Sequence, residues 1–181
     1  MLVLTGERSP DPTVSTFSFF KEIIGYDDEN ADAYYLRGNI YLEEGDADKA
    51  VSDFDKALKY TDENAKMSVE IAQDLIAADM DADKYLKNML NDEASSAGDY
   101  YYRGYAYFIM EDYDNAISSL KSALKADDEE YARDSLKLEI RAYEQKADFE
   151  NAYSLIKDYV EKYPDDEEGQ KEYTFLESRI Q

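Results

Sequence analysis

The stretch Tyr-Tyr-Leu-Arg-Gly-Asn-Ile-Tyr at residues 34–41 returns in similar form at residues 100–107 as Tyr-Tyr-Tyr-Arg-Gly-Tyr-Ala-Tyr. Each copy leads into an acidic turn and then into a second matching stretch. Residues 48–51 read Asp-Lys-Ala-Val, and residues 114–117 read Asp-Asn-Ala-Ile. Two matches in the same order and at the same spacing indicate an internal repeat.

Each repeat unit is expected to be a pair of helices joined by a tight turn. Apolar residues recur at steps of three and four along both stretches, which is the period of an α-helix. Small residues mark the place where the two helices cross, with Gly38 facing Ala50 and Ala57, and with Gly104 in the equivalent position. A glycine inside a helix costs about 1 kcal/mol relative to alanine. Its use at two equivalent positions therefore predicts a close helix crossing.

This unit resembles the tetratricopeptide repeat (TPR), a helix pair of about 34 residues. The family signature places an aromatic residue, a glycine and a tyrosine on the first helix. An alanine, an aromatic residue or leucine, and a second alanine follow on the second helix. Both copies fill these positions, with Tyr34, Gly38, Tyr41, Ala50, Phe54 and Ala57 in the first and Tyr100, Gly104, Tyr107, Ala116, Leu120 and Ala123 in the second. The resemblance implies an all-α fold, a right-handed superhelix (solenoid) of antiparallel helix pairs.

The resemblance covers most of the chain. Pro10 and Pro12 disfavour helix at the start, so we expect an N-terminal tail at 1–14 and a fold that begins near Val14 or Ser15. The tetratricopeptide repeat domain is expected at 15–181. Its expected parts are a half repeat at 15–30, repeats at 31–64, 65–96, 97–130 and 133–166, and a capping helix at 167–181.

The composition excludes several classes of function. The chain carries a net charge of −23 and has no Cys and no His. This charge repels nucleic-acid phosphates and anionic lipids, and zinc sites of the usual ligand types are excluded. Residues 79–83 resemble the start of a calcium loop, but Lys84 replaces the required glycine and Leu90 the bidentate glutamate. We expect no catalytic residue, no metal site and no cofactor.

The sequence leaves the compartment open. It has no apolar run of about 18 residues that would span a membrane. Residues 4–6, Leu-Thr-Gly, resemble the end of a bacterial lipoprotein signal, but Glu7 stands where the lipid-bearing cysteine would be. We expect a soluble protein, in the cytoplasm or in a bacterial extracytoplasmic compartment.

The resemblance implies a protein–protein interaction module, an adaptor or assembly factor, that binds a partner segment in its concave groove. In this family the first helix of each pair lines the concave face. The expected partner-binding residues on that face are Tyr35, Asn39, Val69, Gln73, Tyr101, Tyr105, Phe108, Lys137 and Arg141. The many tyrosines among them favour binding, because tyrosine is enriched at protein interfaces.

Lys137 and Arg141 offer two interpretations. They are four residues apart and lie on one helix face, so together they suit an acidic group on the partner. Alternatively, each cation is answered locally by Asp134 or Glu144 on a solvated surface.

A second function class is a self-assembling scaffold that uses its terminal helices. The half repeat begins with Phe17, Phe19 and Phe20. An unpaired helix with these side chains leaves apolar surface uncovered, which predicts a homo-oligomer through the N-terminal half repeat.

Overall fold

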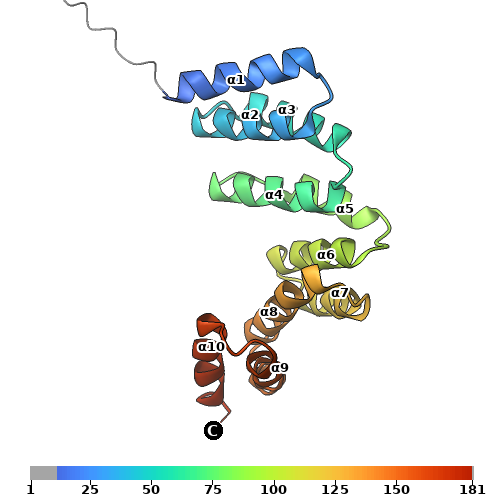
Figure 1. Ribbon diagram of the computed structural model, residues 1–181, viewed down its shortest axis with the longest axis vertical. Coiled ribbons are helices and arrows are strands. Elements are labelled where there is room, and N and C mark those ends of the chain that lie inside the picture. Colours follow the sequence, from blue (N-terminus) through green and yellow to red (C-terminus); the bar gives the residue numbers. More distant parts are fainter. Residues whose placement is uncertain (1–11, 181) are drawn as a thin grey trace, which may run out of the picture. The chain divides into compact units, whose positions relative to one another are not determined.

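A computed structural model of the protein describes residues 12–180, with side chains from residue 16 onward. These residues form ten helices and contain no strand (Figure 1), which confirms the predicted all-α fold class. The helices are α1 (Pro12–Tyr26), α2 (Ala31–Glu43), α3 (Ala47–Tyr60), α4 (Asn64–Ala77), α5 (Asp83–Asn91), α6 (Ala97–Ile109), α7 (Tyr113–Lys125), α8 (Glu129–Gln145), α9 (Phe149–Lys162) and α10 (Glu167–Glu177). Within residues 12–180, none of the helices has the length and apolar content that a membrane span requires.

The chain divides into two compact units, Met1–Asp83 and Lys84–Gln181. We call them the N-terminal unit and the C-terminal unit and describe each by itself. The repeat boundaries given above stay a prediction.

Helix α1 begins earlier than expected. The expected start near Val14 or Ser15 is wrong, because the helix already includes Pro12. Proline is well tolerated in the first turn of a helix, where its missing N–H has no partner to lose. The expectations for the lipoprotein-like residues 4–7 and for Pro10 lie outside the described residues.

In the N-terminal unit, α2 and α3 pack side by side as the closely crossing pair that the sequence predicts (Figure 1). A Cβ atom on Gly38 would lie 2.6 Å from Cε1 of Phe54, so the ring of Phe54 fills the space above the glycine. Arg37 and Asp53 join the same two helices by a bidentate ion pair, with Nε–Oδ2 at 2.6 Å and Nη2–Oδ1 at 2.8 Å. Helix α1 packs on α2, where the rings of Phe17 and Tyr41 meet edge to face.

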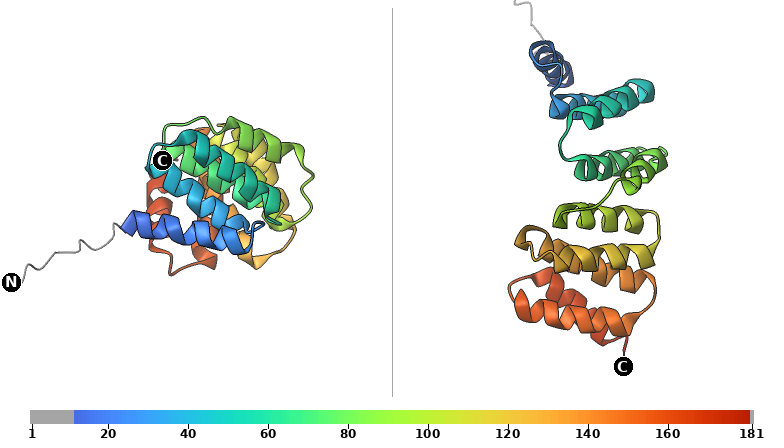
Figure 2. Two further views of the ribbon diagram at one scale, coloured as in Figure 1. Left: turned by 90° about the horizontal axis from the view of Figure 1, so that it is seen from above. Right: turned by 90° about the vertical axis from the view of Figure 1, so that its right-hand side faces the viewer.

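The C-terminal unit repeats this packing. A Cβ atom on Gly104 of α6 would lie 2.7 Å from Cγ of Leu120 on α7. Helix α9 lies against both α8 and α10 (Figure 2). A core joins these three helices through the buried residues Ile140, Ala152, Ile156, Tyr159 and Leu176.

Acidic turns cap three of the helices, α3, α7 and α9. The side chains of Asp46, Asp112 and Asp148 accept hydrogen bonds from backbone N–H groups in the first turns of α3, α7 and α9. A carboxylate at a helix N-terminus also interacts favourably with the helix dipole. The chain reverses just before all three of these caps at residues with positive φ, Gly45 at 77°, Glu111 at 60° and Ala147 at 56°. Part of the large negative charge therefore has a local structural role.

Candidate functional site

In the N-terminal unit, Tyr35 of α2 is bound to α4. Its hydroxyl donates a hydrogen bond of 2.6 Å to Oδ2 of Asp74. Burial, together with this bond to a carboxylate, raises the pKa of Tyr35 above its ordinary value. Asn39 lies one turn further along α2, and its Oδ1 atom is buried without a hydrogen-bond partner among the described residues. The hydroxyl of Tyr35 is therefore used inside the unit, and only part of the ring stays exposed.

Two small pockets lie between α2 and α4. One, of about 330 Å³, is lined by Asn39, Leu42, Glu43, Asp74, Ala77 and Ala78. The other, of about 220 Å³, is lined by Asp32, Tyr35, Leu36, Thr61, Glu63, Lys66, Met67 and Glu70. Both pockets carry more carboxylates than cations, which disfavours an anionic ligand in either of them.

The other two expected residues of this unit differ in exposure. Val69 is only 2% exposed, so the expectation that it contacts a partner is wrong. Helix α4 buries Met67, Ser68, Val69 and Ile71. The buried face of α4 is therefore wider than a single apolar stripe along the helix. Gln73 is exposed on α4.

The C-terminal unit has an aromatic surface on α6. Tyr101, Tyr105 and Phe108 are all partly exposed there. The Tyr101 ring centroid lies 5.0 Å from Tyr102, 6.1 Å from Tyr105 and 5.7 Å from Tyr131 of α8. We call Tyr101, Tyr102, Tyr105 and Tyr131 the tyrosine cluster. Burial raises the pKa of Tyr101 above its ordinary value, so this ring at the centre of the cluster is uncharged near neutral pH.

Tyr131 was not among the residues predicted for this surface. Its ring lies 3.0 Å from the position that a Cβ atom on Gly98 would take. Gly98, in the first turn of α6, could have indicated this contact in the sequence, because a glycine inside a helix often marks the close approach of a neighbouring side chain or helix.

Lys137 and Arg141 of α8 have different surroundings. Lys137 forms ion pairs with Asp166 at 2.8 Å and with Glu168 at 3.8 Å, so a local carboxylate answers it, although not the expected Asp134. The guanidinium of Arg141 lies 5.1 Å from the centroid of the Phe108 ring on α6. Within residues 16–180, no carboxylate forms an ion pair with Arg141. The two cations therefore do not act as one positive site.

Asp166, the N-cap of α10, connects three helices. It accepts hydrogen bonds from Arg133 of α8 at 2.7 Å, from Tyr159 of α9 and from the backbone N–H of Gly169. The bond from Lys137, followed by those from Tyr159 and Arg133, holds the pKa of Asp166 well below its usual range. This buried carboxylate is a structural connection rather than a free site.

The environment of Glu144 on α8 differs from that of an exposed carboxyl group. Glu144 lies one turn beyond Arg141, and its Oε1 atom is buried without a hydrogen-bond partner among residues 16–180. Burial, followed by the neighbouring carboxyl group of Glu172, raises the pKa of Glu144 to about 8, while Arg141 acts in the opposite direction. The sequence predicted Glu144 only as a local partner for a cation of α8, and it gave no signal that Glu172 would lie near it.

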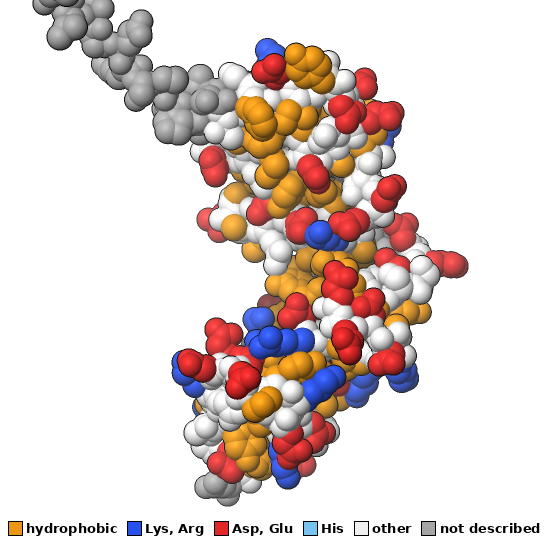
Figure 3. Space-filling view, in the orientation of Figure 1, with side chains coloured by type: hydrophobic (Ala, Val, Ile, Leu, Met, Phe, Trp, Pro, Cys, Tyr) orange, Lys and Arg blue, Asp and Glu red, His pale blue; other side chains and the backbone are white. Residues whose placement is uncertain are grey.

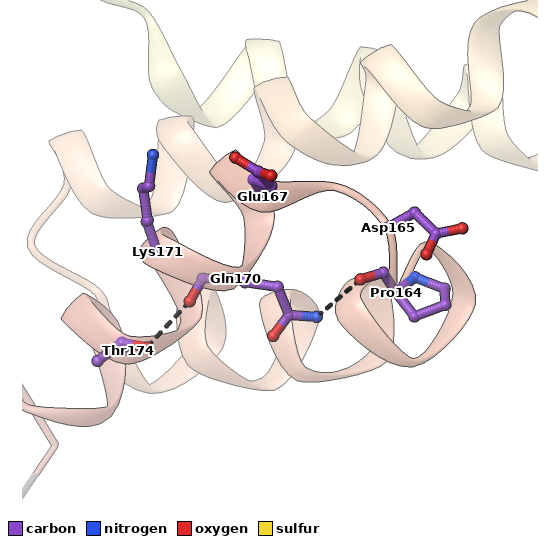
Figure 4. Close-up of a pocket in the computed structure, with 6 residues that line it drawn as sticks. All are labelled: Pro164, Asp165, Glu167, Gln170, Lys171 and Thr174. Carbon is purple, nitrogen blue, oxygen red and sulfur yellow. Dashed lines mark hydrogen bonds between the residues drawn. The ribbon is translucent and has the colours of Figure 1, made fainter.

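An open hollow of about 710 Å³ lies along α10 and the residues that precede it (Figure 4). It is lined by Pro164, Asp165, Glu167, Gln170, Lys171 and Thr174. Figure 4 shows Gln170 donating to the Pro164 carbonyl, at 3.4 Å. No buried polar group points into this hollow among the residues that line it, so it has few features of a specific site.

Acidic side chains are spread over the surface that Figure 3 shows, and Lys and Arg side chains are fewer. In the part of the chain that the structure describes, no group of three or more His, Cys, Asp and Glu side chains could hold a metal ion. The feature that remains for a protein partner in the C-terminal unit is the aromatic surface of α6 with Arg141.

The family model described as tetratricopeptide repeat matches two segments, residues 31–60 and residues 100–130. These segments contain the α2–α3 pair and most of the α6–α7 pair. No curated protein matches the sequence.

Solved structures of similar fold extend over more of the chain. A thermophilic TPR protein of Thermus thermophilus is similar with a TM-score of 0.59 and 17% identity, over 91% of this chain and 90% of that chain. PilW, a type IV pilus biogenesis factor, has a TM-score of 0.58 and 18% identity, over 84% of this chain and 70% of that one. The APC/C hetero-tetramer Cut9–Hcn1 has a TM-score of 0.62 and 14% identity, over 93% of this chain but only 34% of that one. At these identities the likeness establishes the fold alone.

Proposed function

We propose that this chain, a member of the tetratricopeptide repeat family, is an adaptor or assembly factor that binds a segment of a partner protein along α6 and α8. The observation that carries this proposal is the aromatic surface of α6 next to Arg141, which forms no ion pair within the described residues. Tyrosine and arginine are the residue types that most often dominate binding energy at interfaces. The repeat fold is in general a non-enzymatic scaffold, and we propose no catalytic step.

The surface suggests the chemistry of the segment. An apolar or aromatic side chain would pack on the partly exposed rings of Tyr105 and Phe108. Arg141 stacks on Phe108, and stacking leaves the N–H groups at the edge of a guanidinium free to bind a carboxylate. An acidic group on the partner would therefore meet Arg141 alone, since Lys137 is held by Asp166.

We expect the double variant Tyr105→Ala/Arg141→Ala to bind such segments at least about thirtyfold more weakly, the size of an interface hot spot. Peptides are selected from a random library on the wild-type protein, and their affinities for both proteins are measured by calorimetry. Circular dichroism shows whether the helices of the variant are intact. The matched control is Tyr26→Ala/Lys21→Ala on α1, which removes an exposed tyrosine and an exposed cation elsewhere. Equal binding to the wild type and to the α6–α8 variant would overturn the proposal.

Self-assembly through α1 is the second candidate, and exposed apolar residues favour it. Phe19 is 57% exposed and its ring contacts Phe20, with centroids 5.4 Å apart. Tyr26, at the end of the same helix, is 85% exposed. The net charge of −23 opposes self-association, so salt would strengthen it.

If α1 mediates self-assembly, the mass of the wild-type protein should rise with concentration at physiological salt. Phe19→Ser should shift the association to at least about tenfold higher concentration, because it removes a large exposed apolar side chain from this surface. Sedimentation equilibrium measures both quantities. A monomeric mass for the wild type over the whole concentration range would contradict this candidate.

A further inference from the structure

The two pockets between α2 and α4 repeat each other along both helices. The lining positions on α2 are the same in both pockets after a shift of seven residues, which relates Asp32 to Asn39, Tyr35 to Leu42 and Leu36 to Glu43. The same shift on α4 relates Met67 to Asp74 and Glu70 to Ala77. Seven residues are two helical turns, about 10 Å along the axis. We call the two pockets together the α2–α4 groove.

The smaller pocket suits an apolar side chain. Its wall contains Leu36, Met67 and Tyr35, and Leu36 is 42% exposed, so this apolar surface is open to a partner. Among the residues that line this pocket, the single cation is Lys66, which forms an ion pair of 3.0 Å with Glu63 of the same pocket. Its volume of about 220 Å³ accommodates a side chain such as leucine.

The larger pocket suits a basic side chain. The residues that line it include the carboxylates of Glu43 and Asp74 and no cation. Asn39 also lines this pocket, and its Oδ1 atom is buried without a hydrogen-bond partner among residues 16–180. A buried carbonyl oxygen without a donor costs free energy. This oxygen therefore indicates, independently of the carboxylates, that a hydrogen-bond donor is missing here.

We propose that the α2–α4 groove binds a basic amphipathic helix of a partner protein. An apolar side chain of that helix packs on Leu36 in the smaller pocket, and a Lys or Arg side chain seven positions away enters the larger pocket. Side chains seven positions apart lie on one face of a helix, about 10 Å from each other, which is the spacing of the two pockets. The cation then donates hydrogen bonds to the carboxylate of Glu43 and to Oδ1 of Asn39.

Two properties of the protein favour this partner. The hydroxyl of Tyr35, in the smaller pocket, donates a hydrogen bond of 2.6 Å to Asp74, in the larger one, so part of each wall is held in place before binding. A protein of charge −23 also attracts a basic segment at long range. The inference goes beyond the proposed function, because a helix bound here lies on the N-terminal unit and does not use the α6–α8 surface.

Two synthetic peptides of identical composition test the spacing. Both have a neutral, Ala-rich helical framework with one Leu and one Lys, seven positions apart in the first peptide and five positions apart in the second. A separation of five turns the two side chains about 140° away from each other, so only the first peptide reaches both pockets. Each peptide is made in both orders, Leu before Lys and Lys before Leu.

Fluorescence anisotropy of the labelled peptides at low salt measures their affinities. The better of the two seven-spaced peptides should bind at least about tenfold more tightly than either five-spaced peptide. All of these peptides carry the same charge, so a general attraction to the acidic surface contributes equally to each.

Variants locate the binding. Glu43→Gln should weaken binding of the seven-spaced peptide at least about fivefold, whereas Glu44→Gln, at the exposed next position outside both pockets, should leave it unchanged. Leu36→Ala should weaken it at least about threefold. Its control is Ile76→Ala, which shortens an apolar side chain that is 47% exposed on α4 and lines neither pocket.

The outcomes are separate from those of the proposed function. No binding, or equal binding of the seven-spaced and five-spaced peptides, would overturn the inference. Binding that is insensitive to both Glu43→Gln and Leu36→Ala would also overturn it, because the peptide would then lie elsewhere on the acidic surface. The seven-spaced peptide should bind Tyr105→Ala/Arg141→Ala as tightly as the wild type, and a loss there would place it on the α6–α8 surface instead.

Discussion

Replacing Asp166 with alanine should lower the free energy of unfolding of the C-terminal unit by about 3 kcal/mol. Its carboxylate is 6% exposed and holds the cations of Arg133 and Lys137. Losing one partner of a buried ion pair costs about 3–5 kcal/mol. The lower end applies here because Arg133 and Lys137 are themselves 48% and 35% exposed and regain water. The variant also loses the N-cap of α10.

Urea titration followed by circular dichroism measures this loss. The control is Asp165→Ala, a change at the exposed neighbouring position, which should alter the unfolding free energy by less than about 0.5 kcal/mol. Asp166→Asn keeps an N-cap acceptor but removes the charge, so its loss of unfolding free energy should lie between those of Asp165→Ala and Asp166→Ala. A loss below about 1 kcal/mol in Asp166→Ala would show that the hydrogen bonds and ion pairs of Asp166 contribute little to the stability of the C-terminal unit.

The same carboxylate makes stability depend on acidity in a definite direction. The pKa of Asp166 is lower in the folded protein than in the unfolded chain, where it is near 3.9. The stabilisation is therefore complete above about pH 4 and is lost as the pH falls further. In wild-type protein the C-terminal unit should lose stability below this pH more steeply than in Asp166→Ala.

The sequence predicted the parts of the fold that depend on local pattern. Two copies of one signature were enough to predict the crossing of α2 with α3 and of α6 with α7, because Gly38 and Gly104 mark close contacts. The helix caps were implicit in the acidic turns, since an aspartate before a helix satisfies its free N–H groups.

The side-chain partners could not be predicted in the same way. Lys137 bonds to Asp166 instead of the nearby Asp134, because the entry to α10 brings a residue distant in sequence next to α8. Val69 was assigned to an open face by analogy with the other repeats. It is buried because α4 buries residues on several sides. The influence of Glu172 on the pKa of Glu144 likewise depends on where α10 lies, which no repeat pattern specifies.

The largest loss in the N-terminal unit is expected from Phe54→Ala, about 4 kcal/mol in the free energy of unfolding. Phe54 is fully buried, and its ring fills the space that the missing side chain of Gly38 leaves open. Removing the ring loses its transfer free energy and leaves a cavity at the α2–α3 crossing. Thermal and urea unfolding measure the loss, and a value below about 2 kcal/mol would contradict the assignment of Phe54 as the centre of this contact.

A double-mutant cycle tests whether the glycine and the ring form one contact. Gly38→Ala alone places a methyl group 2.6 Å from Cε1 of Phe54, and such overpacking costs about 1–3 kcal/mol. In the Phe54→Ala background the same methyl group enters open space and gains helix propensity of up to about 1 kcal/mol. Gly38→Ala should therefore stabilise the Phe54→Ala protein although it destabilises the wild type. The coupling free energy between the two substitutions should exceed about 1 kcal/mol. Gly25→Ala on α1, where no atom lies within 4 Å of the added methyl group, should show no coupling to Phe54. Additive effects of Gly38→Ala and Phe54→Ala would mean that the glycine is kept at this crossing for a reason other than the ring above it.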